Sequence, residues 1–497
     1  MKPSVVRTYA SMIIPGKFTA LLVLSGAISA ATHAIADADS YLTGKNELSL
    51  KLRNYYQDRR PTDPSNTYID QSGKKVNTHT KQQAWGQGLE INFDSAYLGN
   101  ETAGIGMDFS LYSGLKLMGD KDRFGTTIAK EDTPHYDSAS QRYLAEQSNY
   151  AKVGQVYAKA FVGNEGQKAS AKIGWHQIDR TLMKPCHRLT PTTFQGASAD
   201  AELGNVDLYG SWYNKVSRHN NDKFEDMTSS KSGIDGANNT YEKINYAYTL
   251  GGSYNHESGL GSELAYAESE SYLKLYHANL NYTFSLNANT ALLLEGQYFK
   301  GEGNGDKWKD NTKTYGGFDN SANLYNLNAK LSLDMLSFKA SYSQVDAEKK
   351  KGNGLGVFDY HLAYDSGRSY DNMGYWTNRQ ISDFNHNGEK VWQAGVSYTF
   401  DQIGAPGLML GYTYTQGSDI KTNNTSYADQ YKESEHNIQV GYDFQQEQLR
   451  GLSFKLQYAK YKADKELTEI KNNSKEGYSD NGMTDLRVYI DYTLSVF

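Results

Sequence analysis

The chain has 497 residues, a formal net charge of −6 and 40 tyrosines, and this acidic balance argues against nucleic acid as a partner. No run of 18 apolar residues follows the first 36 positions, which excludes a helical membrane protein. The single cysteine, Cys186, cannot form an internal disulfide, so the fold must be stabilised in another way.

The amino terminus has the pattern of a secretory leader. Lys2, Arg7 and Lys17 surround the start of an apolar run at 18–31, and residues 34–36 (AIA) form a small-residue cleavage signal. We therefore predict a signal peptide over residues 1–36 and a mature chain over 37–497. Loss of the three basic residues changes the charge of the mature chain from −6 to −9.

Beyond the leader, apolar and polar residues alternate with a period of two, which predicts strands with one apolar and one polar face. In the first strand, for example, Leu50 and Leu52 face one way while Lys51 and Arg53 face the other. In chain order the predicted strands are 46–56, 85–93, 105–111, 150–163, 167–178, one ending at Gly204, 206–212, 246–254, 264–266, 276–284, 292–298, 325–333, 336–342, 392–400, 408–414, 438–444, 452–458 and 486–497.

The connections between these strands alternate strictly between nine long loops and eight short turns. The long loops are 57–83, 116–149, 176–192, 218–242, one between 266 and 276, 302–319, 347–387, one between 414 and 438, and 463–482. This pattern predicts one all-β domain, an 18-stranded antiparallel transmembrane β-barrel with long loops at one rim and short turns at the other. Aromatic girdles would account for the many tyrosines. A transporter of 22 strands with a separate plug domain would need a longer chain.

The final predicted strand, residues 486–497, has the clearest alternation of apolar and polar residues. Leu486, Val488 and Ile490 alternate with Arg487 and Tyr489, and the pattern continues to the aromatic terminus. A sandwich edge strand shows a similar pattern, but a closing barrel strand must pair with the first strand and leaves no edge.

The residues on the polar faces of the strands are predicted to line the lumen of such a barrel. One interpretation is that their charges are solvated or paired with one another. The other is that some of the basic residues form a rail that guides anionic solutes. The basic set is Arg53, Lys172, Lys330, Lys339, Lys455 and Arg487, and the acidic set is Glu90, Asp94, Glu295, Asp443 and Asp491.

The third long loop and its flanks, residues 176–196, mix basic residues with an unusual apolar content for an exposed loop. We predict that this loop folds into the lumen and places His187 or Arg188 at a constriction, with Arg180 nearby. The alternative is an ordinary surface loop.

Two further features of the sequence bear on metal binding and catalysis. Residues 383–388 (DFNHNG) match the start of a calcium loop, but Ala394 stands where its closing glutamate should be, so a turn with side-chain-to-backbone bonds is favoured over a metal site. No nucleophile elbow or zinc-protease spacing occurs, and we predict no catalytic residue, no metal and no cofactor.

The chain resembles the OprD-type outer-membrane porins over essentially its whole mature length. The resemblance is carried by 85–93 (WGQGLEINF), 188–196 (RLTPTTFQG), 382–390 (SDFNHNGEK) with Trp392-Gln393, 404–411 (GAPGLMLG), 449–454 (LRGLSF) and 492–494 (YTL). It implies 18 strands, an inward-folded third loop and a basic rail that select the solute.

The resemblance also implies passive uptake of small hydrophilic solutes across the outer membrane of a bacterium. Gln195, within the segment 194–197 (FQGA), resembles the chitoporin branch, whereas Arg188 resembles importers of amino acids and carboxylates. The expected partners are outer-membrane lipid, the solute and the barrel-assembly machinery, which would recognise the C-terminal strand of a monomer or weak oligomer. The alternatives are a β-rich adhesin or glycan-binding protein and a barrel-embedded hydrolase.

Overall fold

The fold is taken from a computed structural model that describes residues 42–62, 67–69, 75–77, 81–140, 142–230, 241–311, 317–350, 355–365, 368–422, 430–467 and 481–497. The predicted signal peptide, residues 1–36, lies outside the described residues. Within them, no helix is long and apolar enough to cross a bilayer.

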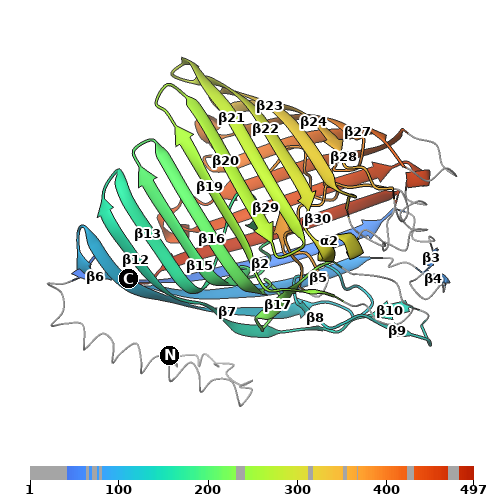
Figure 1. The fold of residues 1–497 in the computed structure, drawn as a ribbon, viewed down its shortest axis with the longest axis horizontal. Coiled ribbons are helices and arrows are strands. Elements are labelled where there is room, and N and C mark those ends of the chain that lie inside the picture. Colours follow the sequence, from blue (N-terminus) through green and yellow to red (C-terminus); the bar gives the residue numbers. More distant parts are fainter. Residues whose placement is uncertain are drawn as a thin grey trace, which may run out of the picture.

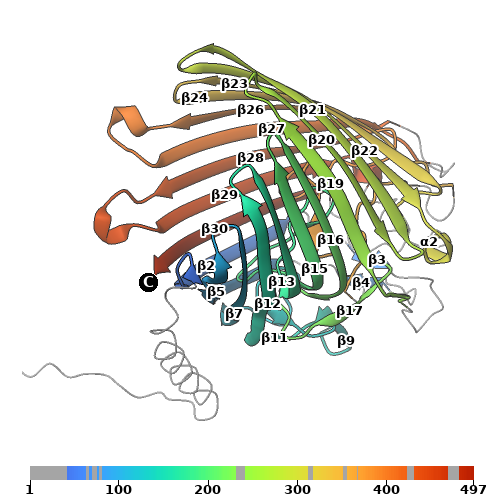
Figure 2. The same cartoon turned by 60° about the vertical axis from the view of Figure 1, so that its left-hand side comes forward.

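The described chain forms a closed antiparallel barrel of 18 long strands, as predicted. Figures 1 and 2 show the strands as a tilted ring whose first and last members lie side by side. The barrel strands are β2 (Glu47–Pro61), β5 (Gln82–Asp94), β7 (Ala103–Met118), β12 (Tyr150–Asn164), β13 (Gln167–His176), β15 (Thr193–Leu203), β16 (Val206–Ser217), β19 (Ala247–Asn255), β20 (Leu260–Ser269), β21 (Leu273–Asn287), β22 (Thr290–Gly303), β23 (Ser321–Leu333), β24 (Leu336–Asp346), β26 (Lys390–Thr399), β27 (Leu408–Ile420), β28 (Tyr431–Asp443), β29 (Leu452–Ala463) and β30 (Gly482–Ser495).

Short strands and helical turns lie at the two ends of the barrel. β1 (Leu42–Thr43), β6 (Tyr97–Asn100), β17 (Glu225–Thr228) and β18 (Lys243–Ile244) extend the main sheet. Separate pairs are β3 (Thr67–Ile69) with β4 (Lys75–Asn77), β8 (Lys130–Glu131) with β11 (Gln147–Ser148), β9 (His135–Asp137) with β10 (Arg142–Leu144), and β14 (Lys184–Pro185) with β25 (Asp371–Asn372). The helical pieces are α2 (Asp306–Asn311), η2 (Asp401–Ile403) and η3 (Glu447–Leu449).

Closure of the barrel comes from β30, the strand with the strongest sequence signal. It pairs with β29 on one side and with β2 on the other, where Ser49 lies opposite Ser495 and Pro61 opposite Met483. The ring therefore has no unpaired edge, which is the condition for strands to cross a bilayer.

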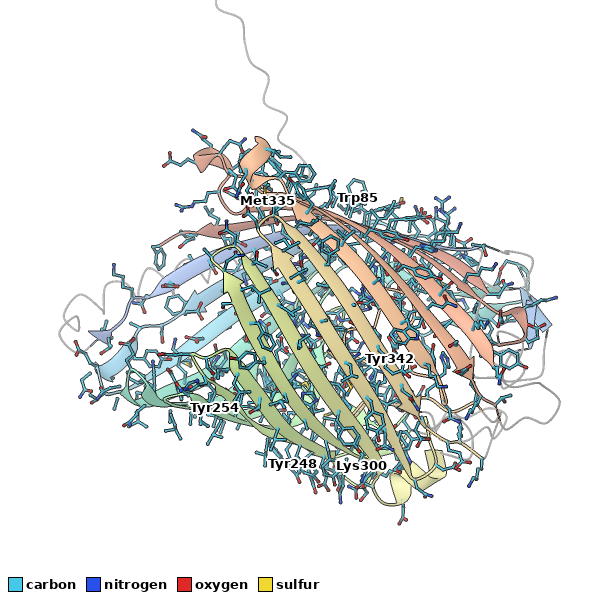
Figure 3. The ribbon with its side chains drawn as sticks, turned by 90° about the horizontal axis from the view of Figure 1, so that it is seen from above. Trp85, Tyr248, Tyr254, Lys300, Met335 and Tyr342 are labelled. Atoms are coloured by element: carbon cyan, nitrogen blue, oxygen red, sulfur yellow. The ribbon has the colours of Figure 1, made fainter. Side chains whose placement is uncertain are left out.

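The predicted facing of the strands is confirmed. Ile105, Ile173, Leu264 and Leu327 are more than 60% exposed on the outside, because this surface meets lipid rather than protein. Aromatic rings follow the outer surface near the rims, as labelled for Trp85, Tyr248 and Tyr342 in Figure 3 and as seen in the Tyr282–Phe284, Tyr398–Phe400 and Tyr442–Phe444 pairs.

Two details of the predicted topology are corrected. The connection between β20 and β21 is only residues 270–272 and not a long loop, so one position of the loop rim has a tight turn. The first strand also continues beyond residue 56 to Pro61, because Gln57, Asp58 and Arg59 keep their pairing to β30 and β5 above the apolar band.

Candidate functional site in the barrel interior

The third loop, L3 (residues 177–192), crosses the lumen to the wall formed by β2 and β30. Arg188 of L3 donates a hydrogen bond from Nη1 to the Tyr55 hydroxyl (3.0 Å), and Arg53 donates from Nη1 to the Arg188 carbonyl oxygen (3.1 Å). The prediction that this loop folds inward is met by these contacts, which join segments more than 130 residues apart in the sequence.

The glycines of the segment 85–93 make room for L3. A Cβ atom at Gly88 would lie 2.3 Å from the Leu189 carbonyl oxygen, and one at Gly86 would lie 2.6 Å from the Leu189 Cδ1 atom. Any side chain at Gly88 would therefore push the L3 backbone away from the wall. This close approach explains why the segment 85–93 has a glycine at this position.

Arg188 lies at one end of a stack of two tyrosine rings that has a cation at each end. The Tyr55 and Tyr489 rings stack with centroids 4.2 Å apart and an interplanar angle of 11°. The Arg188 guanidinium carbon lies 6.0 Å from the Tyr55 centroid, and Lys455 Nζ lies 4.5 Å from the Tyr489 centroid. Cation–π attraction thus holds two charges at the lumen wall without a carboxylate.

The cations of this wall differ in their partners. Arg53 forms a bidentate pair with Asp491 (2.7 and 2.9 Å), and Arg487 binds Asp485 through Nε and Nη2 (3.0 and 2.7 Å). In contrast, no carboxylate of the described residues lies at ion-pair distance from Arg188, Lys330, Lys339 or Lys455. The wall therefore offers uncompensated positive charge to the lumen.

His187 follows the same loop but is not charged. Burial lowers its pKa, Asp179 opposes this, and the positive charges of Arg53 and Lys51 lower the pKa further. Its Nδ1 atom accepts a hydrogen bond from the Thr192 amide (3.3 Å). The lowered pKa of His187 therefore favours the neutral form of its imidazole.

The seventh loop, L7 (residues 347–389), also folds inward and packs against L3, which the sequence did not predict. Its buried residues Phe358, Tyr360, Leu362, Tyr370 and Tyr375 pack with L3 residues against the wall from β15 to β24. L3 and L7 are also joined to each other through the β14–β25 pair and a hydrogen bond from the Cys186 amide to the Tyr370 carbonyl (2.8 Å). Aromatic density in 358–376 is the signal that could have indicated an inward loop.

A polar cavity of about 480 Å³ lies between L7 and the wall formed by β24 and β26 to β30. Lys339, Arg379 and Arg487 line it, together with a neutral floor that includes Ser397, Thr413 and Gln439. Lys330 lies directly opposite Lys339 in the β23–β24 register, and Lys339 Nζ lies 5.7 Å from the Trp376 ring. Arg379 Nη2 donates to the Trp376 carbonyl (2.7 Å), while its buried Nε has no partner within the described chain.

Not all predicted rail residues share this wall. Arg180 is bound bidentately by Asp200 (2.6 and 3.1 Å), and Lys172 lies over the Tyr157 ring, both on the side formed by β12 to β16. Glu90 lies opposite Lys51 in the β2–β5 register, at the edge of the cationic wall. The structure therefore groups Arg53, Arg188, Lys455 and Arg487, adds Lys330 and Lys339 across the cavity, and separates Lys172 and Arg180.

The calcium-like segment is a structural part of L7. The Asp383 carboxylate accepts from the Tyr360 hydroxyl (3.1 Å), Asn385 donates from Nδ2 to the Phe358 carbonyl (2.9 Å), and Asn387 accepts from the Ala347 amide (2.9 Å). The three side chains bind different parts of the loop rather than one point, as expected for a turn with side-chain-to-backbone bonds.

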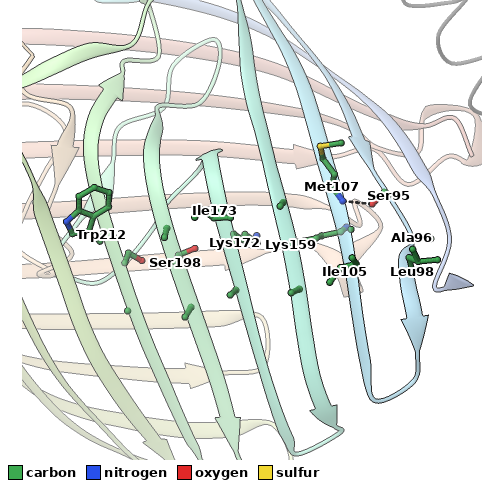
Figure 4. A pocket seen from close by; sticks show the side chains of 18 of the residues that line it. Ser95, Ala96, Leu98, Ile105, Met107, Lys159, Lys172, Ile173, Ser198 and Trp212 are labelled. Carbon is green, nitrogen blue, oxygen red and sulfur yellow. Dashed lines mark hydrogen bonds between the residues drawn. The ribbon is translucent and has the colours of Figure 1, made fainter. Parts of the chain in front are cut away.

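A concavity of about 1230 Å³ lies on the outside of the barrel and not in the lumen. Figure 4 shows it spanning several strands between Leu98 and Trp212, with Ile105 and Ile173 among its labelled residues. Small residues such as Ala158 and Ala171 form its floor. Because its lining is apolar and belongs to the lipid-facing surface, acyl chains rather than a hydrophilic solute fit this space.

Comparisons with known proteins agree with the architecture. The sequence profile of outer membrane porins of the OprD family matches residues 41–496. Porin D of Pseudomonas aeruginosa PAO1 is 26% identical over 95% of this chain and 97% of its own length, and Chitoporin of Escherichia coli K12 is 24% identical over 78% and 80%. Among solved structures, Pseudomonas aeruginosa OccK9 (OpdG) has a TM-score of 0.69 at 20% identity, covering 91% of this chain and 98% of that one. A BenF-like porin from Pseudomonas fluorescens Pf-5 has a TM-score of 0.68 at 20% identity, covering 92% and 100%.

Proposed function

Because this chain belongs to the OprD family of outer membrane porins, and is a channel protein rather than an enzyme, we propose that it admits small hydrophilic solutes that carry a carboxylate. One observation carries this choice of solute. Arg188, Lys339 and Lys455 present positive charge to the lumen, and no carboxylate of the described residues neutralises them at ion-pair distance. A solute carboxylate can supply the missing negative charge.

The paired arginines have a different role in this proposal. Arg53 and Arg487 are held by Asp491 and Asp485, so they keep the geometry of the wall fixed while the unpaired cations exchange partners. Weak, sequential contacts suit conduction, because a solute must leave each contact as readily as it enters. The cavity of about 480 Å³ beside L7 has the volume of a site for a small molecule.

Chitooligosaccharides are the second candidate, favoured by the similarity to the Escherichia coli protein named Chitoporin. Sugar rings commonly pack on open aromatic faces. In the central stack, however, Tyr55 and Tyr489 stack on each other, with Arg188 beside Tyr55 and Lys455 beside Tyr489. Tyr55 is 0% and Tyr489 8% exposed, so neither ring offers an open face, which supports the carboxylate over the sugar.

Planar-bilayer recordings distinguish the two. We expect benzoate to interrupt the current or to permeate, while benzamide, which has the same shape without the charge, has no effect. Equal responses to benzoate and benzamide would overturn the proposed selectivity. Interruption by chitohexaose alone would support the second candidate instead.

We further propose that residues 1–36 are removed on secretion, that the assembly machinery recognises β30, and that the barrel conducts as a monomer or weak oligomer. The support is that β30 supplies the closing pairs to both β2 and β29. A conducting species of one chain mass in native mass spectrometry is the expected result, and a stable trimer would contradict it.

A further inference from the structure

A compact group of ligand-type side chains lies at the loop rim, where L7 rejoins the barrel. It consists of His386 at the end of L7, Glu389 directly before β26, and Glu433 near the start of β28. The three residues are 4%, 0% and 2% exposed. One imidazole and two carboxylates are therefore held together away from bulk water.

The distances suit a metal ion better than a hydrogen bond. His386 Nδ1 lies 3.3 Å from Glu389 Oε2 and also 3.3 Å from Glu433 Oε1. A single ring nitrogen carries at most one proton and cannot donate well to both oxygens, and 3.3 Å is long for such a bond. The same distance is the edge of a tetrahedron whose bonds to the centre are about 2.0 Å, which is the bond length of zinc to nitrogen and oxygen ligands.

The second carboxylate oxygen of Glu389 gives an independent indication. Glu389 Oε1 is buried and has no hydrogen-bond partner within the described chain. Glu389 Oε1 fills the space that a side chain at position 417 would need, because a Cβ atom on Gly417 would lie 1.7 Å from this oxygen. Gly417 is the register partner of Glu433, so this unpartnered oxygen points into the space beside the Glu433 side chain. A buried oxygen without a partner is costly unless a cation or proton joins it.

Neighbouring groups orient the proposed ligands. Glu433 accepts hydrogen bonds from the Tyr461 hydroxyl (2.6 Å) and the Ser382 hydroxyl (2.9 Å), and Glu389 accepts from the His386 amide (2.9 Å). Such partners fix the direction of a carboxylate and are a regular feature of metal sites.

We propose that His386, Glu389 and Glu433 bind one divalent transition-metal ion of the Zn²⁺ class, which fastens the end of L7 to the barrel wall. One imidazole with two carboxylates suits such an ion, whereas Ca²⁺ requires six to eight oxygen ligands. The site stands apart from the solute selectivity proposed above.

The ion would affect the channel through residues 379–382 of L7, which connect the proposed metal site to the polar cavity. Ser382 binds Glu433, and the amides of residues 380–382 bind Glu435 two positions along the same strand. Gln380, the first residue of this anchor, and Arg379 directly before it line the polar cavity. Occupancy of the site should therefore reduce the fluctuations of L7 and of the current.

Metal binding can be measured on the full-length purified porin after treatment with a chelator. Titration with ZnCl₂ in a calorimeter should give one site per chain, and His386→Ala or Glu433→Gln should weaken zinc binding at least tenfold. His256→Ala is the matched control, because His256 lies in a turn at the opposite rim, where its ring interacts with Ser258 and Tyr254 and with no ligand-type side chain of the described residues. The proposal would be overturned if His256→Ala lost zinc binding, or if His386→Ala and Glu433→Gln bound zinc as tightly as the wild type.

A measurement on the unaltered protein guards against variants that fail to fold. Crystals soaked in ZnCl₂ should show one anomalous peak at the zinc edge between His386 Nδ1 and the two carboxylates. A peak only at surface histidines, or none, would mean that the group shares a proton instead of a metal. Channel noise should also fall when zinc is added to the wild type and remain unchanged in His386→Ala.

Discussion

Lys455 provides the sharpest test of the cationic wall. Its Nζ atom lies over the Tyr489 ring at 4.5 Å, and no carboxylate of the described residues forms an ion pair with it. In water a unit charge attracts an anion about 5 Å away by about 0.8 kcal/mol, and screening at 0.1 M salt reduces this to about 0.5 kcal/mol, which corresponds to about a twofold local enrichment of anions and a matching depletion of cations. We therefore expect Lys455→Gln to lower the ratio of anion to cation permeability by about fourfold at 0.1 M salt.

Reversal potentials across a KCl gradient in planar bilayers measure this ratio. At 1 M salt the screening length falls from about 10 Å to about 3 Å, so the difference between Lys455→Gln and wild type should nearly disappear. Lys460→Gln is the matched control, because Lys460 is on the same strand but exposed on the outward-facing set of residues. Equal effects of both variants, or an effect of Lys455→Gln that is independent of salt, would refute the assignment of Lys455 to the ion path.

Three further outcomes are expected. Leu456→Arg places a charge on the lipid face and should lower the free energy of unfolding from lipid vesicles by about 2–4 kcal/mol, whereas a loss as small as that of Lys455→Gln would mean that the facing is wrong. Arg188→Gln removes the bond to the Tyr55 hydroxyl and should change single-channel conductance or ion preference; unchanged values would remove L3 from the constriction. Burial alone would lower the pKa of His361, but the Asp371 carboxylate 2.5 Å away raises it to about 9, so this pair stabilises L7 fully below about pH 6.5 and loses that effect as pH rises through about 9. Current noise should therefore increase between pH 7 and pH 10 in the wild type, and a similar increase in His361→Gln would contradict this origin.

The barrel itself could be predicted because lipid on one side and water on the other impose a period of two on each strand. The ends of the strands were predicted less well, because there both faces of a strand are polar and the period of two disappears. At Asp58 and Arg59 both faces are polar, yet pairing with β30 continues, so the strand is longer than its apolar pattern. The polar stretch after Tyr266 resembles a loop, but Glu268 pairs with Lys274 and accepts a bond from the Tyr248 hydroxyl (2.9 Å), which leaves only a tight turn.

The site was less predictable because it depends on which strands become neighbours of which loops. Alternation correctly identified Lys172, Lys339 and Lys455 as candidates on polar faces, but it contains no information on whether they share a wall. Arg379 and Trp376 were missed for a different reason: L7 has no periodic pattern, so nothing local shows that this segment turns back into the lumen.

The two inward loops together explain why charge gathers on one wall. L3 and L7 bury their apolar side chains against the wall from β15 to β24, where Phe194, Tyr213 and Phe299 form the receiving surface. Water is excluded where these loops pack, and an unpaired cation there would carry a large desolvation cost. Lys330 and Lys339 avoid this cost because they lie toward the short-turn ends of β23 and β24, whereas the buried Leu324 and Val345 lie toward the loop ends. The polar route is thereby confined to the wall that runs from the short-turn ends of β23 and β24 through β30 to β2, where Lys339 and Arg487 line the cavity and Lys455 lies in the stack. The same packing that narrows the barrel thus determines which wall a solute must follow, and a change in L7 should alter selectivity even when no charged residue is replaced.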